Sequence, residues 1–369
     1  MKLTILKNDL SWGLSNISRV ITGRGQLPVL SNVLIEATKN GLVLSGTNLD
    51  LGMRVTLGGK IEEEGSLTVP AKTLTEFVSS IIFETVEITT QGDKLKVVSG
   101  KQQATLAGIP AAEFPIIPKM GKNKDKSFVF PHQIISEIAT SVAYAASSDE
   151  SRPVLTGVRF SVFGNQLIVV ATDGFRLAKK TIKIDDATIL GEGLILPART
   201  IVELSRLVES SKDEVSMTWI PENNQVIFGL GEIELVSRIL QGNFPDTEKI
   251  IPKDFKTELK IDREELLKDL RAAGIFAREN SNIVKFSVQG LVLRVQASGG
   301  QIGENESEIE IETEGEDLET AFNFKYLLDF LNSVVGERIT MRLNEPTSAA
   351  VLGVDGQEDL VALIMPVRV

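Results

Sequence analysis

Apolar residues recur at helical spacing in three stretches of the chain. Within each stretch they follow one another at intervals of three or four residues, which predicts an amphipathic helix with one buried face. The positions are Leu10, Leu14, Ile17 and Ile21; Ile134, Ile138, Val142 and Ala145; and Leu266, Leu270, Ala273 and Ala277. Asp262 precedes the third stretch, where its side chain can cap the first free amides of the helix.

Much of the remaining chain consists of short segments in which apolar and polar residues alternate. LVLSGT at 42–47, LIVVAT at 167–172 and LVLRVQ at 291–296 are examples, and Gly, Asn or Asp lie beside such segments. This pattern predicts half-buried strands. Together with the helices it predicts an α+β fold in which helices pack on one side of antiparallel sheet.

The chain repeats itself. LPVLSNVLIEATKNGLVLSGT, beginning at Leu27, aligns without a gap with RPVLTGVRFSVFGNQLIVVAT, beginning at Arg152, and a third copy begins at Ser281. An extended stretch that runs into a helix also recurs, at 67–81, 194–208 and 320–334. We therefore expect three homologous domains, each with two helices packed on antiparallel sheets. Their expected limits are 1–121, 128–252 and 253–369.

Composition excludes several kinds of chemistry. The chain is 42% hydrophobic and 24% charged, and no apolar run reaches the roughly 20 residues that span a bilayer. Cysteine is absent and His132 is the only histidine, which excludes disulfides, thiol catalysis and multi-histidine metal sites. We expect no metal, no cofactor and a cytoplasmic protein without a signal peptide. His132 follows Pro131 at a predicted helix start and is interpreted as a surface residue.

Charge is distributed unevenly within a net balance of −11. Residues 304–319 contain nine Asp or Glu and no Lys or Arg, and their alternation predicts a solvent-facing strand. On the helix that follows Asp262, by contrast, Lys268, Arg271 and Arg278 share one face. Basic helix faces are either an ordinary solvated surface or a lining for a polyanion. Composition does not choose between these alternatives.

The stretch ATDGFRLA at 171–178 also has two interpretations. Asp173 and Arg176 could be a reactive pair, as in a hydrolase or transferase. Asp173-Gly174 between apolar runs is, however, a strong signal for a tight hairpin turn, in which Asp173 would serve through its backbone. One histidine, no cysteine and no glycine-rich phosphate loop weaken the enzyme interpretation. A peptide-binding scaffold that never meets DNA is a second alternative.

Several motifs together resemble those of a known family. They are ATDGFRLA (171–178), Phe114-Pro115, Phe244-Pro245, the threefold repeat and the terminal MPVRV (365–369). In this combination and order the chain resembles, over its entire length, the β sliding clamp of bacterial DNA polymerase III.

The resemblance implies a non-catalytic replication protein. Two crescent-shaped copies would join head to tail in a ring that encircles duplex DNA without sequence-specific contacts. The ring would tether the replicative polymerase for processive synthesis. Implied partners are the DNA polymerase III α subunit, the clamp loader, other DNA polymerases, and mismatch repair and ligase proteins, but no membrane. These proteins would insert short peptides, with glutamine, leucine and phenylalanine anchors, between the second and third domains.

The resemblance also implies site residues. The walls of the peptide pocket would be Leu155, Thr172, Gly174, Phe175, Arg176, Leu177, Pro245, Ile250, Leu363, Ile364, Met365, Pro366, Val367 and Arg368. From the residues alone, the favoured interpretation of the same positions is that they are core and edge-strand residues. The DNA contacts would be Arg24, Lys72, Arg152 and Arg199, and the dimer interface would include Ala104, Ile275 and Phe276.

The chain departs from the family pattern at several of these places. Phe175 replaces a histidine and Lys249 stands where an arginine is found, which would change peptide preference. Pro153 and Val154 occupy positions of a tyrosine pair near the DNA, and Ala104 replaces an aromatic residue at the dimer interface.

Overall fold

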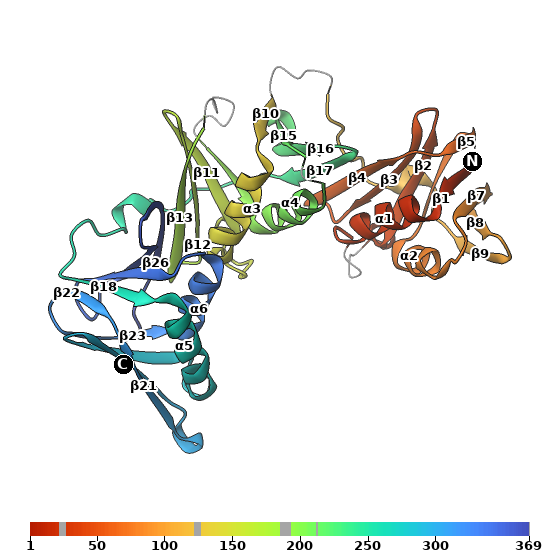
Figure 1. The fold of residues 1–369 in the computed structure, drawn as a ribbon. Helices are drawn as coiled ribbons and strands as arrows, with labels where there is room; N and C mark the ends of the chain where they lie inside the picture. The colour runs from red at the N-terminus through yellow and green to blue at the C-terminus, as the bar shows by residue number, and fades with distance from the viewer. Residues whose placement is uncertain (22–26, 122–126, 185–192, 212, 369) are drawn as a thin grey trace. The chain divides into compact units, whose positions relative to one another are not determined.

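The computed structural model describes residues 1–21, 27–121, 127–184, 193–211 and 213–368 (Figure 1). The chain forms two compact units. Unit 1 comprises Met1–His132 and Glu203–Ile239, and unit 2 comprises Gln133–Val202 and Leu240–Val369. The second repeat therefore contributes to both units. No helix among the described residues is long and apolar enough to cross a membrane.

Unit 1 contains two sheets. The five-stranded sheet has the order β5 (Lys60–Glu63), β1 (Lys2–Leu6), β7 (Thr85–Gln91), β8 (Lys94–Ser99) and β9 (Gln102–Ala107). The eight-stranded sheet has the order β10 (Ser127–Phe130), β15 (Val215–Ile220), β16 (Gln225–Leu230), β17 (Ile233–Arg238), β4 (Leu51–Leu57), β3 (Gly41–Thr47), β2 (Asn32–Thr38) and β6 (Gly65–Pro70). Its helices are α1 (Lys7–Ser18), α2 (Ala71–Ser80) and most of α4 (Ala198–Ser211).

Unit 2 is built in the same way. Its nine-stranded sheet has the order β14 (Leu194–Pro197), β11 (Gly157–Phe163), β12 (Gln166–Thr172), β13 (Arg176–Lys183), β26 (Gln357–Ile364), β25 (Ala350–Val354), β24 (Arg338–Leu343), β18 (Thr257–Asp262) and β22 (Glu312–Gly315). The four-stranded sheet has the order β21 (Glu304–Glu310), β20 (Val292–Ser298), β19 (Ile283–Gln289) and β23 (Leu318–Asn323). Its helices are α3 (His132–Ser141), α5 (Arg263–Ala277) and α6 (Phe324–Ser333).

The predicted fold class is confirmed. The strand ladders among the described residues are antiparallel. In unit 2, α5 and α6 lie together against the sheets (Figure 1). Gly274 permits this approach, because a Cβ there would stand 2.5 Å from a ring carbon of Phe324. The helices thus bury one side of the strands, as the alternating pattern predicted.

The predicted helix stripes agree with the structure, with small differences. Asp262 caps α5 by accepting a hydrogen bond from the Glu265 amide at 2.9 Å, and the four predicted apolar positions of α5 are buried. In α1 the stripe is buried up to Ile17, but the helix ends at Ser18, before Ile21. Of the two adjacent isoleucines in α3, Ile135 is buried, whereas the predicted Ile134 is half-buried. α3 also ends at 141, and a 3-10 turn at 143–145 follows.

The acidic segment 304–319 is not one strand. It forms β21, β22 and the first two residues of β23, and β22 belongs to a different sheet from the other two. The chain changes sheets at Ile311, whose side chain is buried between the two. The alternation correctly predicted extended backbone. It could not reveal the change of sheet, because both halves have the same pattern of acidic and apolar residues.

Candidate functional site

The turn at Asp173 is closed by side chains. Thr172 Oγ1 donates to the Arg176 carbonyl at 2.6 Å, and Asp173 Oδ1 accepts from the amides of Phe175 and Arg176 at 2.8 and 2.9 Å. Gly174 has a φ of +91°, which glycine adopts without strain. The hairpin interpretation is therefore correct. The expectation that Asp173 serves through its backbone is wrong, because its carboxylate organises the turn.

Arg176 lies in a pocket of aromatic and acidic side chains. Its Nε donates to Asp173 Oδ2 at 3.0 Å, and its Nη1 pairs with Asp329 of α6. The guanidinium lies over the ring of Tyr326, 4.8 Å from its centre, and 5.5 Å from the centre of the Tyr144 ring. Burial raises the pKa of both phenols. Cation–π contacts and ion pairs thus hold the Arg176 side chain in one position.

Sequence reasoning missed Tyr144, Tyr326 and Asp329. The chain has only two tyrosines, and both lie beside Arg176. The rarity of tyrosine in the sequence was the only signal that could have drawn attention to these two residues. However, Tyr144 comes from the 3-10 turn after α3 and Tyr326 from α6, so only the fold brings them together.

The C-terminal segment lies directly beside this hairpin. Strand β13 pairs with β26, with Arg176 opposite Ile364 and Leu177 opposite Leu363. The Met365 amide then donates to the Phe175 carbonyl at 2.8 Å. The structure thus brings ATDGFRLA and MPVRV together.

Alternation along these strands separates the predicted wall residues onto two faces. Leu177 and Leu363 point into a small apolar cluster with Val170, Val351 and Phe244. Arg176 and Ile364 point to the opposite face, where Ile364 is 1% exposed within the core beneath the helices. The structure therefore does not bring the Ile364 side chain to the same surface as Leu363.

The other wall residues form a buried floor with an exposed apolar rim. Thr172, Leu155, Leu177 and Leu363 are buried. Phe175, Ile250 and Met365 are 62%, 45% and 39% exposed. Half-buried or exposed around them are Gly174, Arg176, Pro245, Pro366, Val367 and Arg368. We call this set, without Ile364, the partner groove; Arg176 belongs to it through its backbone, because its side chain points to the opposite face. Exposed apolar side chains around a preformed floor are typical of a binding surface.

The linker before the third repeat is fixed by ion pairs. Glu248 pairs with Lys179 of β13, and Lys249 pairs with Asp246 at 2.8 Å. The hydrogen bond from Lys249 lowers the pKa of Asp246. Lys249, one of the departures from the family pattern, nevertheless extends into solvent.

The remaining predicted residues lie in several elements. Arg24 lies outside the described residues. Lys72 in the first turn of α2, Arg152 before the 3-10 turn at 153–156 and Arg199 in α4 are exposed. Ile275, on α5, is 60% exposed. Phe276 and Ala104 are half-buried, and Ala104 lies on β9. His132 begins α3 and is half-buried.

Three family models match the chain in order. They describe the N-terminal, central and C-terminal domains of the DNA polymerase III beta subunit and match residues 1–118, 129–246 and 248–368. The beta sliding clamp of Synechocystis sp. is 33% identical, with 100% of this chain and 99% of that protein covered. The beta sliding clamp of Bacillus subtilis is 30% identical, with both chains covered completely.

Solved structures agree with these matches. The DNA polymerase sliding clamp from Bacillus subtilis superposes with a TM-score of 0.94 at 29% identity, over 100% of this chain and 99% of that one. The DNA polymerase III subunit beta from Pseudomonas aeruginosa gives 0.92 at 27% identity, over 100% of both chains. The chain therefore belongs to the DNA polymerase III beta subunit family and is a DNA sliding clamp, a processivity factor that catalyses no reaction.

Proposed function

We propose that two copies of this chain join head to tail in a ring that encircles duplex DNA and slides along it. The observation that carries the proposal is a pair of sheet edges that have no neighbouring strand among the described residues. The five-stranded sheet of unit 1 ends at β9, and the four-stranded sheet of unit 2 ends at β21. An unpaired edge is a template for another strand. Pairing β9 of one copy with β21 of the next satisfies both edges.

The side chains near these edges fit such pairing. The outer strand β21 carries a glutamate at every second position from Glu304 to Glu310, so its edge is strongly acidic. Phe276 lies beside Gly303, at the start of β21, and Ile275 next to it is exposed. Lys94 and Lys96 on β8 complement the acidic β21. Ala104 is the proposed contact on β9.

DNA is held by cations on helices and on the loops that precede them. Exposed basic residues of this kind include Lys268 and Arg271 on α5, Arg278 directly after α5 and Lys325 on α6. The proposed contacts are Arg24, Lys72, Arg152 and Arg199. Attraction to phosphates does not depend on base sequence, so it permits sliding. The strongly acidic β21 and β22 would repel DNA.

The partner groove receives short peptides from replication and repair proteins. Its apolar floor and rim suit leucine and phenylalanine side chains, and the backbone of the hairpin, which Arg176 holds in place, supplies polar groups. The proposed partners are the DNA polymerase III α subunit, the clamp loader, other DNA polymerases, and mismatch repair and ligase proteins, in the cytoplasm. Three domains at 1–121, 128–252 and 253–369 are part of the proposal, supported by the order of the family matches.

A sliding assay tests the ring. The protein is loaded on nicked circular DNA by a clamp loader, the DNA is linearised, and bound protein is measured. We expect the protein to stay on circles and leave linear DNA. Retention on linear DNA with free ends would exclude a topological clamp. Gel filtration should give twice the chain mass of 40.2 kDa, and a monomer at micromolar concentration would contradict the ring.

A further inference from the structure

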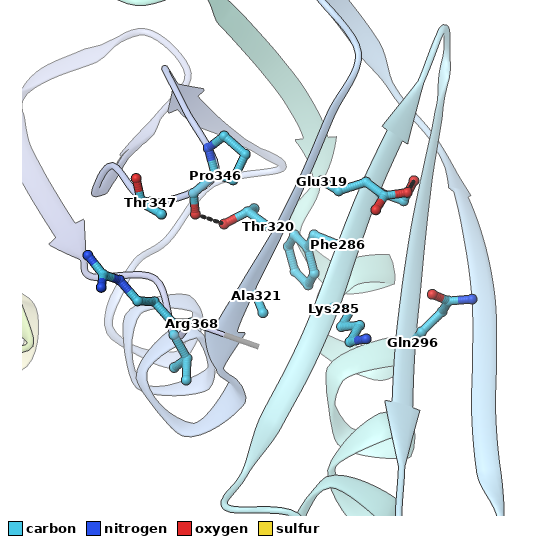
Figure 2. Close-up of a pocket in the computed structure, with 11 residues that line it drawn as sticks. Lys285, Phe286, Gln296, Glu319, Thr320, Ala321, Pro346, Thr347 and Arg368 are labelled. Carbon is cyan, nitrogen blue, oxygen red and sulfur yellow. Dashed lines mark hydrogen bonds between the residues drawn. The ribbon is translucent and has the colours of Figure 1, made fainter.

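A second hollow lies next to the partner groove, on the other side of the C-terminal segment. It has a volume of about 500 Å³ and lies over β19, β20 and β23 of the four-stranded sheet (Figure 2). Pro346 and Thr347 border it on one side, and Val367 and Arg368 on another. Its size is within the range of pockets that hold small ligands or side chains.

The register of the sheet explains the hollow. Ala321, Lys285 and Gln296 are directly opposite one another on adjacent strands, so their side chains share one face. The next row is Glu319, Ser287 and Arg294. Alanine and serine in these rows leave space above the strands. Phe286 and Val295 point to the opposite face, into the core beneath the helices.

Hydrogen bonds fix the borders of the hollow. Thr320 Oγ1 donates to the Pro346 carbonyl at 3.1 Å, which holds the loop against β23 (Figure 2). The Val367 amide donates to the Ala321 carbonyl at 2.8 Å, which holds the C-terminal segment on the edge of the same strand. The hollow is therefore preformed.

Cations outnumber anions among the side chains that line the hollow, where Lys285 and Arg368 face the single carboxylate of Glu319. Glu319 accepts a hydrogen bond from Ser287 at 3.3 Å, and Gln296 donates to Glu306 at 2.6 Å. Lys285 and Arg368 are exposed, and neither forms an ion pair within the described residues. Two cations without an ion pair among the described residues, against one carboxylate, leave the hollow with an excess of positive charge in a chain whose net charge is −11, and this favours an anionic ligand.

We propose that this hollow binds an acidic flank of the partner peptides. The inference rests on the proposed function of the partner groove, since Val367 and Arg368 border both. A peptide that lies along the groove and continues past Val367 enters the hollow. Carboxylate side chains there meet Lys285 and Arg368. The hollow would therefore select, among partners with the same anchors, those with Asp or Glu in the flank.

Peptide binding measured by fluorescence polarisation tests this proposal. The core probe is Gln-Leu-Ala-Leu-Phe, and further probes carry Glu-Glu or Lys-Lys at either end. We expect Glu-Glu at one end to tighten binding about three- to tenfold at low salt, as two exposed ion pairs would. Lys-Lys at that end should weaken it. Lys285→Glu should abolish the preference for Glu-Glu, and Lys285→Ala should reduce it.

The control variant is Lys39→Glu, which changes an exposed lysine between β2 and β3, outside both the groove and the hollow. It should bind every probe like the original protein. Equal affinity for the core and both Glu-Glu probes, or a preference unchanged in Lys285→Glu, would overturn the inference and leave the groove intact. Failure of the core probe to bind the original protein would overturn the groove itself, and the inference with it.

Discussion

The first and second repeats contain the same hairpin, and the two copies have different surroundings. In the first, Thr47 Oγ1 donates to the Leu51 carbonyl at 3.0 Å, and Asn48 Oδ1 accepts from the amides of Asp50 and Leu51. Thr172 and Asp173 make the same bonds in the second. Leu49 has a φ of +80° where Gly174 has +91°. The backbone turn is thus retained although the residues differ.

The strand after each hairpin pairs with a strand from the end of the following repeat. We call the β4–β17 ladder in unit 1 the first seam and the β13–β26 ladder in unit 2 the second seam. Each ladder has five residue pairs. The residues that differ lie at the start of each ladder. Leu51 and Gly52 of the first hairpin correspond to Arg176 and Leu177 of the second.

The linkers that follow the first and second repeats also differ between the two seams. The first linker reads FPIIP at 114–118, whereas the second reads FPDTEKIIP at 244–252, with four additional residues. In the first seam Ile117 closes over Gly52, its Cγ2 standing 3.2 Å from where a Cβ would lie. In the second, the added residues form a 3-10 turn at 247–249, where Glu248 pairs with Lys179. Two substitutions in the hairpin and an insertion of four residues in the linker therefore distinguish the second seam from the first. The first linker covers the first seam, whereas the partner groove lies at the second.

The largest expected effect comes from removing residues 365–369. The truncated chain keeps β26 to Ile364 but loses the exposed Met365 and the rim of the partner groove. We expect the affinity for the core peptide to fall about 30-fold or more, as for loss of a hot spot. Fluorescence polarisation measures it, and circular dichroism checks folding. Ile116→Ala, which removes a 96% exposed side chain from the first linker, is the matched control and should change nothing. A folded truncated chain with unchanged affinity would refute the assignment of the groove.

Arg176→Leu gives the second hairpin the residue of the first. The variant loses the ion pairs with Asp173 and Asp329 and the contact with Tyr326. We expect about tenfold weaker peptide binding and a loss of about 1–2 kcal/mol in the stability of the hairpin. Arg338→Leu, which breaks an exposed pair with Glu312, should bind peptide within about twofold of the original protein. If both variants bind equally, Arg176 has no role in the groove.

The smallest expected effect concerns the turns themselves. Gly174→Ala places a Cβ at a left-handed position and should cost about 1 kcal/mol of local stability. Leu49→Gly should change the local stability of the first hairpin by less than half of that amount. Relief of backbone strain at Leu49 stabilises the hairpin, whereas the conformational entropy that glycine adds to the unfolded chain destabilises it. Amide hydrogen exchange across residues 166–183 and 41–57 measures the two changes separately. Equal effects in both hairpins would show that the shared φ does not control their stability.

Local patterns predicted local structure well. The cap at Asp262, the buried stripe of α5 and the hairpin at Asp173 all depend on residues within a few positions of each other. The error at Ile134 and Ile135 has a similar origin, since two adjacent apolar residues fit the helical period almost equally well. Repeats were visible because the sequence similarity is strong between the first two copies.

Long-range arrangement could not be predicted in the same way. The residues around Arg176 come from the segments at 143–145 and 324–333, and no pattern connects them in the sequence. The division of the second repeat between two units depends on which strand edges pair. Resemblance to a family supplied most of the residues that we propose for the partner groove, but only the register of β26 shows that Leu363 faces the apolar cluster and Ile364 does not.

The two seams also have a mechanical consequence. Each seam is a ladder of backbone hydrogen bonds between two strands of the same polypeptide. Breaking the hydrogen bonds of one seam therefore leaves its two strands connected through the chain. In the proposed ring, a broken seam would not release the DNA. In the proposed ring, only the junctions between β9 of one copy and β21 of the other lack a covalent connection. A loader that must open the ring therefore has one kind of junction to break, and the partner groove stays assembled while it does so.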